Sequence, residues 1–168
     1  MHDSRLARYD RCVEASRFDE IAFFRAVVTS GARTLLIGRR GLIALGMPVM
    51  TRDYDFWIGA DDADKLNAAV RPFDMFPSQP PDVARQRGRY ALENDEHVDV
   101  LVARAVSTVD GILVEFDRLW ERRIHLKIGD VEVPIPSIDD YILTKRFGGR
   151  PRDADDIRWL EQFRTTKP

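Results

Sequence analysis

Two carboxylates stand two residues apart in the run 51–58, whose other side chains are mostly large and apolar. Side chains of a strand alternate between its faces, so Asp53 and Asp55 share one face, roughly 7 Å apart along the strand. Like charges this close raise each other's pKa unless a cation lies between them. A hard divalent ion such as Mg²⁺ removes the repulsion and prefers oxygen ligands. The spacing therefore suggests a metal site on a buried strand.

A third carboxylate is expected on a second strand, 97–102, whose three valines share one face. Asp99 and His97 then lie on the other face. Two interpretations of Asp99 are open: it completes the metal site, or it pairs with a nearby arginine. His97 either contacts the site or is a partly buried structural histidine, and the latter is the default.

The elements that must position these residues can be read from the apolar periodicity and from Gly and Pro. Before the acidic strand we expect a helix from Phe18 to about Val28, a strand over 34–37 and a short helix ending at Gly46. After it we expect a helix opened by Asp61 or Asp62, an irregular loop over 72–82, a strand over 89–92, a helix over 115–122, a hairpin of 124–128 with 131–133, a helix capped by Ser137, and a last helix over 153–163. This order indicates an α/β (α+β) domain with a mixed sheet flanked by helices and a small C-terminal helical portion.

Length and composition fit one domain of 168 residues and 19.3 kDa with a net charge of −2. We expect an N-terminal arm over 1–16, a core over 17–135 and a C-terminal helical segment over 136–168 packed on the core. The single cysteine, Cys12, excludes an internal disulfide and fits a reducing cytoplasm. No apolar run approaches the ~20 residues of a membrane span, so no membrane association is expected. No histidine has zinc-ligand spacing, and no P-loop is present.

Several segments together resemble one family. They are the strand and turn Leu36-Ile37-Gly38-Arg39-Arg40, the stretch 45–55 ending in Thr51-Arg52-Asp53-Tyr54-Asp55, the third carboxylate Asp99, and a tail over 136–156 with Lys145 and Arg150. This set resembles the nucleotidyltransferase fold of the DNA polymerase beta superfamily. Within it, the chain most resembles the small bacterial AbiEii-type nucleotidyltransferases. The resemblance covers about residues 34–58 and 97–160.

The resemblance implies a transfer of a nucleoside monophosphate from a nucleoside triphosphate, such as ATP, to a hydroxyl on RNA, a protein or a small molecule. Asp53 and Asp55 would hold the Mg²⁺ (or Mn²⁺) that escorts the triphosphate. Asp99 would complete a second metal position or accept the proton of the attacking hydroxyl. The nucleotide-binding residues would be Gly38, Arg39, Thr51, Lys145 and Arg150. The family also implies a cytoplasmic toxin of a toxin–antitoxin or phage-defence pair, with an antitoxin as partner.

The chain departs from the family at Arg39 and Arg40, where Gly38 is usually followed by Gly or Ser. Arg39 is expected to donate to the phosphates, because helix N-termini bind phosphate readily. Two alternatives are open: both arginines are solvated, or they neutralise Asp53 and Asp55 in a site that no longer binds metal. The last one would make the chain a catalytically silent module that binds nucleotide or a partner.

Three further charges have competing interpretations. Lys145 reaches the triphosphate or lies on the surface. Asp153 and Asp156 are expected to be charges at a helix start rather than ligands.

Overall fold

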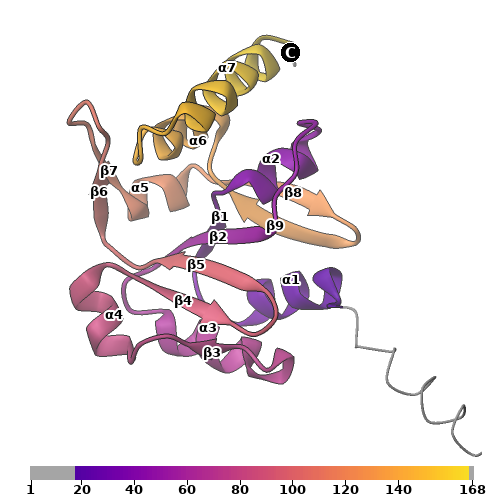
Figure 1. Ribbon diagram of the computed structural model, residues 1–168, viewed down its shortest axis with the longest axis vertical. Coiled ribbons are helices and arrows are strands. Elements are labelled where there is room, and N and C mark those ends of the chain that lie inside the picture. The colour runs from indigo at the N-terminus through magenta and orange to yellow at the C-terminus, as the bar shows by residue number, and fades with distance from the viewer. Residues whose placement is uncertain (1–17, 167–168) are drawn as a thin grey trace, which may run out of the picture.

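The main sheet has five strands, and its pairings are mixed. The computed structural model describes residues 18–166 (Figure 1). The strand order is β1-β2-β5-β4-β3, with β1 at Thr34–Leu36, β2 at Asp53–Ile58, β5 at His97–Leu101, β4 at Arg89–Glu93 and β3 at Phe76–Pro77. β2 pairs with β5 in parallel, and the other neighbours are antiparallel. The α/β fold with a mixed sheet, predicted from the sequence, is confirmed.

Three helices cover the apolar face of this sheet: α1 (Glu20–Thr29), α3 (Ala63–Val70) and α4 (Pro81–Arg87). Tyr54, Phe56 and Ile58 of β2 point into this core, as their alternation predicts. The helix predicted from Phe18 onward is α1, which begins after Asp19 because the Asp19 side chain accepts a hydrogen bond from the Ala22 amide.

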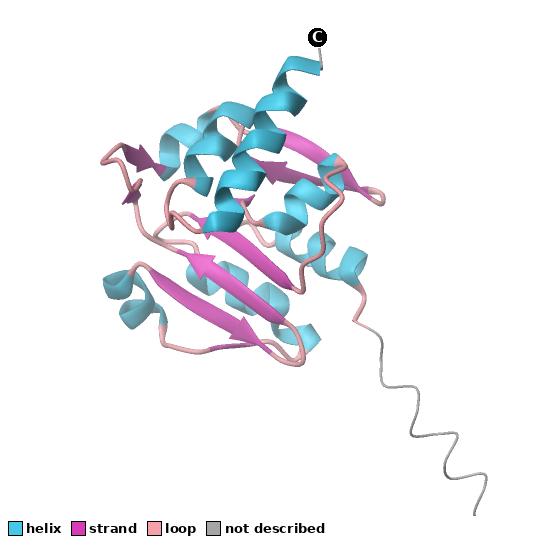
Figure 2. Ribbon diagram, turned by 45° about the horizontal axis from the view of Figure 1, so that its top comes forward, coloured by secondary structure: helices cyan, strands magenta, loops and turns pink. Residues whose placement is uncertain are grey.

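On the side of the opposite face lie α2 (Arg39–Leu45), which packs directly on β2, α6 (Ile138–Lys145) and the long helix α7 (Pro151–Thr166), which packs on α6. These helices lie together above the sheet in Figure 2. Tyr141 of α6 donates a hydrogen bond of 2.6 Å to the carbonyl of Gly38, directly before α2. A Cβ at Gly41 would overlap the Tyr141 hydroxyl, so a glycine is needed for this close approach.

Two hairpins complete the chain. One pairs β6 (Ala105–Ser107) with β7 (Leu113–Glu115), and α5 (Phe116–Glu121) follows it directly. The other pairs β8 (Ile124–Ile128) with β9 (Val131–Ile135) and lies beside α1, α2 and β1. The second hairpin was predicted; the first, β6–β7, was not.

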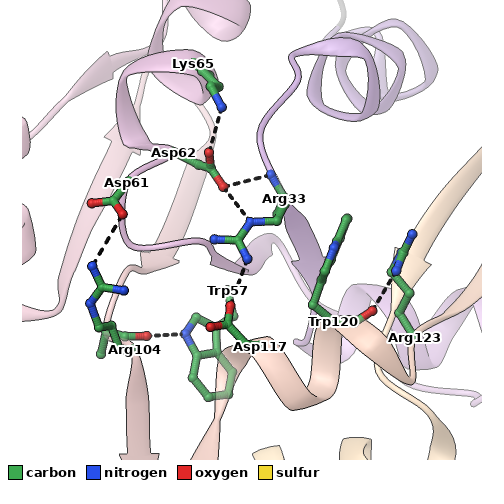
Figure 3. A network of polar contacts seen from close by, with 10 residues as sticks. Arg33, Trp57, Asp61, Asp62, Lys65, Arg104, Asp117, Trp120 and Arg123 are labelled. Carbon is green, nitrogen blue, oxygen red and sulfur yellow. Dashed lines mark hydrogen bonds and ion pairs between the residues drawn. The ribbon is translucent and has the colours of Figure 1, made fainter.

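The C-terminal end of β2 is fastened by polar contacts (Figure 3). The indole of Trp57 donates to the carbonyl of Ala103 at 2.8 Å, and its ring packs on Phe116 of α5. Just beyond β2, the carboxylate of Asp62 accepts hydrogen bonds from Arg33 and Lys65. The sheet is thus held firmly at the end of β2 that lies away from Asp53.

The expectation of an irregular loop over 72–82 is wrong. This stretch contains the end of the 3₁₀ helix η2 (Arg71–Phe73), the strand β3 and the start of α4. Pro81 opens α4 in the first turn, where the missing N–H of proline costs nothing. Edge strands also tolerate proline, and Pro77 lies in β3 at the sheet edge.

Most other boundaries differ by one or two residues; α7 begins at Pro151 rather than at Asp153 and ends at Thr166, three residues beyond the expected end. The predicted arm 1–16, including Cys12, lies outside the described residues, and the division at residues 17–135 and 136–168 stays a prediction. Within residues 18–166, no helix is both long and apolar enough to cross a membrane.

Candidate functional site

Two of the three carboxylates lie side by side on neighbouring strands. Asp55 of β2 is the register partner of Asp99 of β5, and Asp53 is the partner of His97. Partnered residues point to the same face of a sheet, so all three carboxylates face the side covered by α2 and α6. The carboxylate of Asp55 lies so close to Gly38 that a Cβ at position 38 would overlap it. Glycine at the start of α2 therefore makes room for Asp55.

The pKa of Asp55 is raised above its usual range. Burial is the largest cause, and the neighbouring charges of Asp99 and Asp53 add to it, while Lys145 opposes them. Burial and two neighbouring carboxylates thus both disfavour the charged form of Asp55.

Lys145 faces these carboxylates from the end of α6, and it is not a surface lysine. Its side chain is 7% exposed and forms an ion pair of 3.1 Å with Asp156 of α7, which is itself buried. Burial lowers the pKa of Lys145, although Asp156 and Asp55 act in the opposite direction. Asp156 also accepts hydrogen bonds from Arg39 at 3.2 Å. One buried carboxylate therefore holds two cations beside Asp55.

Arg150 and Thr51 are fixed in a similar way. The guanidinium and the backbone amide of Arg150 both donate to Asp153, in the first turn of α7. The hydroxyl of Thr51 accepts a hydrogen bond of 3.3 Å from the amide of Asp53 and so helps to set the start of β2.

All eight residues predicted for the site line one cavity of about 510 Å³. We call it the site cavity. Its lining includes Gly38, Arg39, Thr51, Asp53, Asp55, Arg89, Asp99, Lys145, Arg150 and Arg152. Three carboxylates on the sheet thus face four cations from the helices and the α6–α7 turn, with Arg89 contributed by β4.

His97 contacts the site through Asp99. Its Nε2 lies 3.1 Å from Oδ1 of Asp99, and its Nδ1 lies 3.2 Å from Glu93 of β4. Burial lowers the pKa of His97, but the hydrogen bond and charge of Asp99, together with Glu93, outweigh it and raise the pKa. His97 is therefore a residue that contacts the site, rather than a structural histidine alone.

The donor chemistry of the site suits a hard divalent cation. Asp53, Asp55 and Asp99 supply only carboxylate oxygens. The pKa of Asp55 is raised by burial and, to a smaller extent, by repulsion from Asp99 and Asp53, and a cation would relieve this repulsion. Within residues 18–166, no three side chains of His, Cys, Asp or Glu gather closely enough to enclose a metal alone. This arrangement fits Mg²⁺, which is often held by one or two carboxylates, waters and the phosphates of a substrate.

Arg39 and Arg40 do not occupy the place of a metal between the strand carboxylates. Arg39 is paired with Asp156. Arg40 points to the other side of β2, where it lies 4.4 Å from the centre of the Tyr54 ring and 3.4 Å from Glu20. The hypothesis that both arginines neutralise Asp53 and Asp55 is wrong, because each has another acidic partner, and neither is simply solvated.

Solved structures with the same arrangement of elements are nucleotidyltransferases. TM1012 of Thermotoga maritima, assigned as a nucleotidyltransferase, superposes with a TM-score of 0.56 at 16% identity, over 96% of this chain and 97% of its own. The lincosamide antibiotic adenylyltransferase LnuA, bound to lincomycin, gives 0.59 at 15% identity, over 86% and 98%. The antibiotic-resistance factor ANT(2'')-Ia gives 0.58 at 13% identity, over 86% of both chains. The chain has the nucleotidyltransferase fold.

The similarity to these nucleotidyltransferases is in the fold and not in the amino-acid sequence. No protein-family model matches the chain, and no curated protein sequence does either. The nucleotidyltransferase fold nevertheless explains why residues from four distant segments meet in the site cavity, since α2, β2, β5 and α6 converge there.

Sequence reasoning missed the roles of Asp156 and Asp153. Asp153 lies in the first turn of α7, as expected for a helix-start charge, but it was not predicted that both carboxylates are buried and hold cations of the site cavity. A signal was present, because Asp153, Asp156 and Leu160 recur at helical spacing and so share one face of α7. Leu160 on that face is buried in the core.

Proposed function

We propose that this protein is a metal-dependent nucleotidyltransferase. One observation carries the proposal. Asp55 and Asp99 lie side by side on neighbouring strands, Asp55 beneath Gly38, and Asp156 holds Lys145 and Arg39 on the opposite side of the cavity. Acidic ligands on rigid strands and fixed cations across a cavity are what nucleotidyl transfer requires. The nucleotidyltransferase fold of the structural neighbours supports this conclusion.

The proposed reaction transfers a nucleoside monophosphate to a hydroxyl. The hydroxyl oxygen bonds to the α-phosphorus of a nucleoside triphosphate such as ATP, the bond from that phosphorus to the bridging oxygen breaks, and pyrophosphate leaves. Asp99 accepts the hydroxyl proton. Lys145, Arg39 and Arg150 hold the phosphates, with Gly38 and Thr51 shaping the loop around them.

Asp53, Asp55 and Asp99 would hold Mg²⁺, or Mn²⁺ in its place. When bound, such a cation neutralises phosphate charge and polarises the reacting phosphoryl group. The acceptor would be a hydroxyl of RNA, of a protein or of a small molecule. LnuA and ANT(2'')-Ia, which have the same fold, are bound to lincomycin and to adenylyl-2''-tobramycin in solved structures.

Transfer of label tests the proposal. The protein is incubated with each α-³²P-labelled triphosphate, Mg²⁺ or Mn²⁺, and cell extract. We expect labelled product with the natural chain and loss of at least 100-fold in Asp53→Asn and Asp55→Asn, an order of magnitude based on removing a charge that acts on the transferred group. Asp64→Asn is the matched control and should keep full activity, because Asp64 is an exposed residue of α3 outside the site cavity.

The silent-module alternative makes a distinct prediction in the same experiment. It requires nucleotide binding, or binding of a partner, without label transfer under any condition. Arg39 is paired with Asp156 and not with Asp53, Asp55 or Asp99, so these three carboxylates are available to bind a cation. This favours the enzyme over the silent module.

The role of Arg39 is tested by Arg39→Ala and nucleotide titration. Loss of one guanidinium–phosphate contact should weaken the affinity by about 10-fold. Unchanged affinity would remove Arg39 from the phosphate site.

We further propose the biological setting implied by the sequence resemblance: an AbiEii-type toxin of the cytoplasm, silenced by an antitoxin. Expression in a bacterial host should arrest growth, and Asp53→Asn should abolish the arrest. Normal growth on expression of a chain that is active in vitro would remove the toxin role and leave the transferase.

A further inference from the structure

The side from which an acceptor enters the site cavity follows from the proposed function, on which this inference rests. The phosphate-binding cations Lys145 and Arg39 lie on α6 and α2, on the side of Asp55 that Gly38 closes. In-line transfer places the attacking oxygen opposite the leaving pyrophosphate. The acceptor must then approach from the other side of Asp55, across Asp99 and over β5 and β4.

The surface on that side is an open sheet face. The side chain of Asp99 is 58% exposed, and its register partner on β4 is the small Ala91. The alternate residues Tyr90, Leu92 and Val100 are buried in the core. Figure 2 shows β4 and β5 with helices behind them and none over the face turned to the viewer.

One free cation stands on this face. Arg89 of β4 lines the site cavity and is exposed, two residues from Ala91, so its Cα is roughly 7 Å along the strand from the position beside Asp99. Arg39, Lys145 and Arg150 each have a carboxylate partner on α7. Neither Arg89 nor Arg152 has an acidic partner among residues 18–166. Arg152 lies on α7 beside the phosphate-binding cations, so Arg89 is the one of the two that stands on the open sheet face.

We propose that the acceptor carries a phosphate close to the reacting hydroxyl, and that Arg89 binds this phosphate. The planar guanidinium matches a phosphate with two parallel hydrogen bonds. With the phosphate on Arg89, a hydroxyl about one sugar unit away reaches Asp99 and gives up its proton there as its oxygen bonds to the α-phosphorus. A polyamine acceptor would instead place its positive charges next to Arg89, which is unfavourable.

Binding without turnover tests the proposal first. The nucleotide site is filled with α,β-methylene ATP and Mg²⁺, and calorimetry follows four probes: ribose 5-phosphate, a short ribo-oligonucleotide, glucose and tobramycin. We expect one or both phosphate-bearing probes to bind, and Arg89→Gln to weaken that binding by about 10-fold or more, with Arg89→Lys in between. Binding of the sugar phosphate alone indicates a small phosphorylated acceptor, and binding of the oligonucleotide alone indicates a nucleic acid end.

Arg87→Gln is the matched control, because Arg87 is a neighbouring exposed arginine outside the site cavity. It should leave the affinities within about twofold, and the melting temperatures of both variants should equal that of the natural chain. Failure of both phosphate-bearing probes, equal affinity in Arg89→Gln, or preferred binding of tobramycin would overturn the proposal.

Label transfer separates this proposal from the proposed function. If the natural chain and Arg89→Gln label tobramycin or glucose equally well, the proposed transferase activity is supported and the proposal of a phosphate-bearing acceptor is rejected. If the protein transfers label from no triphosphate, but Arg89→Gln still abolishes binding of the phosphate-bearing probe, the proposed transferase activity is rejected and the phosphate site at Arg89 is supported.

Discussion

At the scale of single residues, the site is defined by charges that are only partly balanced. Asp55 is buried, lies beside Asp99 and two residues from Asp53 on the sheet, and faces Lys145, so its pKa depends on burial first and then on these charges. Any change in one neighbour should be visible in the pKa of Asp55.

Asp99→Asn should lower the pKa of Asp55 toward its ordinary value, because it removes a nearby negative charge that favours the protonated form. Titration of the metal-free protein by ¹³C NMR of the aspartate carboxyl groups measures this shift. Lys145→Met should raise the same pKa, since a positive charge is lost. If neither substitution changes the pKa of Asp55, solvent screens Asp55 from Asp99 and Lys145, and the three residues do not share one electrostatic site.

Asp156→Asn should cost about 3–5 kcal/mol of unfolding free energy, since it leaves Lys145 buried without its counter-charge and weakens the hold on Arg39. Urea unfolding measures the loss. Asp155→Asn is the control, because the Asp155 carboxylate is exposed and, within residues 18–166, forms an ion pair with Arg158 alone. A loss below about 1 kcal/mol for Asp156→Asn would show that Lys145 is solvated or neutral.

At the scale of elements, the turn from β1 into α2 decides whether the carboxylates can face the phosphates. Gly38 has φ −84° and ψ −170°, which any residue adopts, so the need for glycine is steric rather than conformational. Its missing Cβ is the space that the Asp55 carboxylate occupies.

Gly38→Ala should therefore displace Asp55, abolish most activity and cost about 1–3 kcal/mol of stability through overpacking. Label transfer and urea unfolding give the two readouts. Gly148→Ala in the same cavity is the matched control, because a Cβ there meets its nearest neighbour at 3.4 Å, an ordinary contact. Full activity in Gly38→Ala would mean that α2 can move without cost, contrary to its hydrogen bond with Tyr141.

At the scale of the whole molecule, the site depends on contacts far from it. The network of Figure 3 ties the end of β2 to β1, α3 and α5, and Asp62 is its buried centre. Burial raises the pKa of Asp62, but the hydrogen bonds from Lys65 and Arg33 outweigh it and leave the pKa below its usual value.

Asp62→Asn should lower the unfolding free energy by about 1–3 kcal/mol at pH 7. Because the pKa of Asp62 is depressed by folding, its contribution is present above the unfolded pKa of about 3.9 and disappears as the pH falls through the folded value. Unfolding of both proteins between pH 7 and pH 2 should show the difference closing. Asp61→Asn is the control, since that carboxylate and its partner Arg104 are both exposed; a similar loss there would contradict the assignment.

The sequence by itself determined the longer strands and the face on which the carboxylates lie. Alternation over β2 and β5 placed Asp53, Asp55 and Asp99 on the right face, because the period of a strand leaves only two choices and large apolar residues decide between them. It also predicted α1, α2, α6 and α7 from helical spacing and glycine ends, but missed β3, α4 and the β6–β7 hairpin, which are short and lack a period.

Only the tertiary structure decided the partners of the charges. No local rule pairs Arg39 with Asp156, 117 residues further along the chain, or leaves Arg89 without an acidic partner on the described surface. Ion pairs depend on which helices pack together, and that is set by the burial of α2, α6 and α7 over the sheet. The two-residue period of a strand determines the face on which the carboxylates lie. The packing of elements distant in the sequence determines which cations lie opposite them.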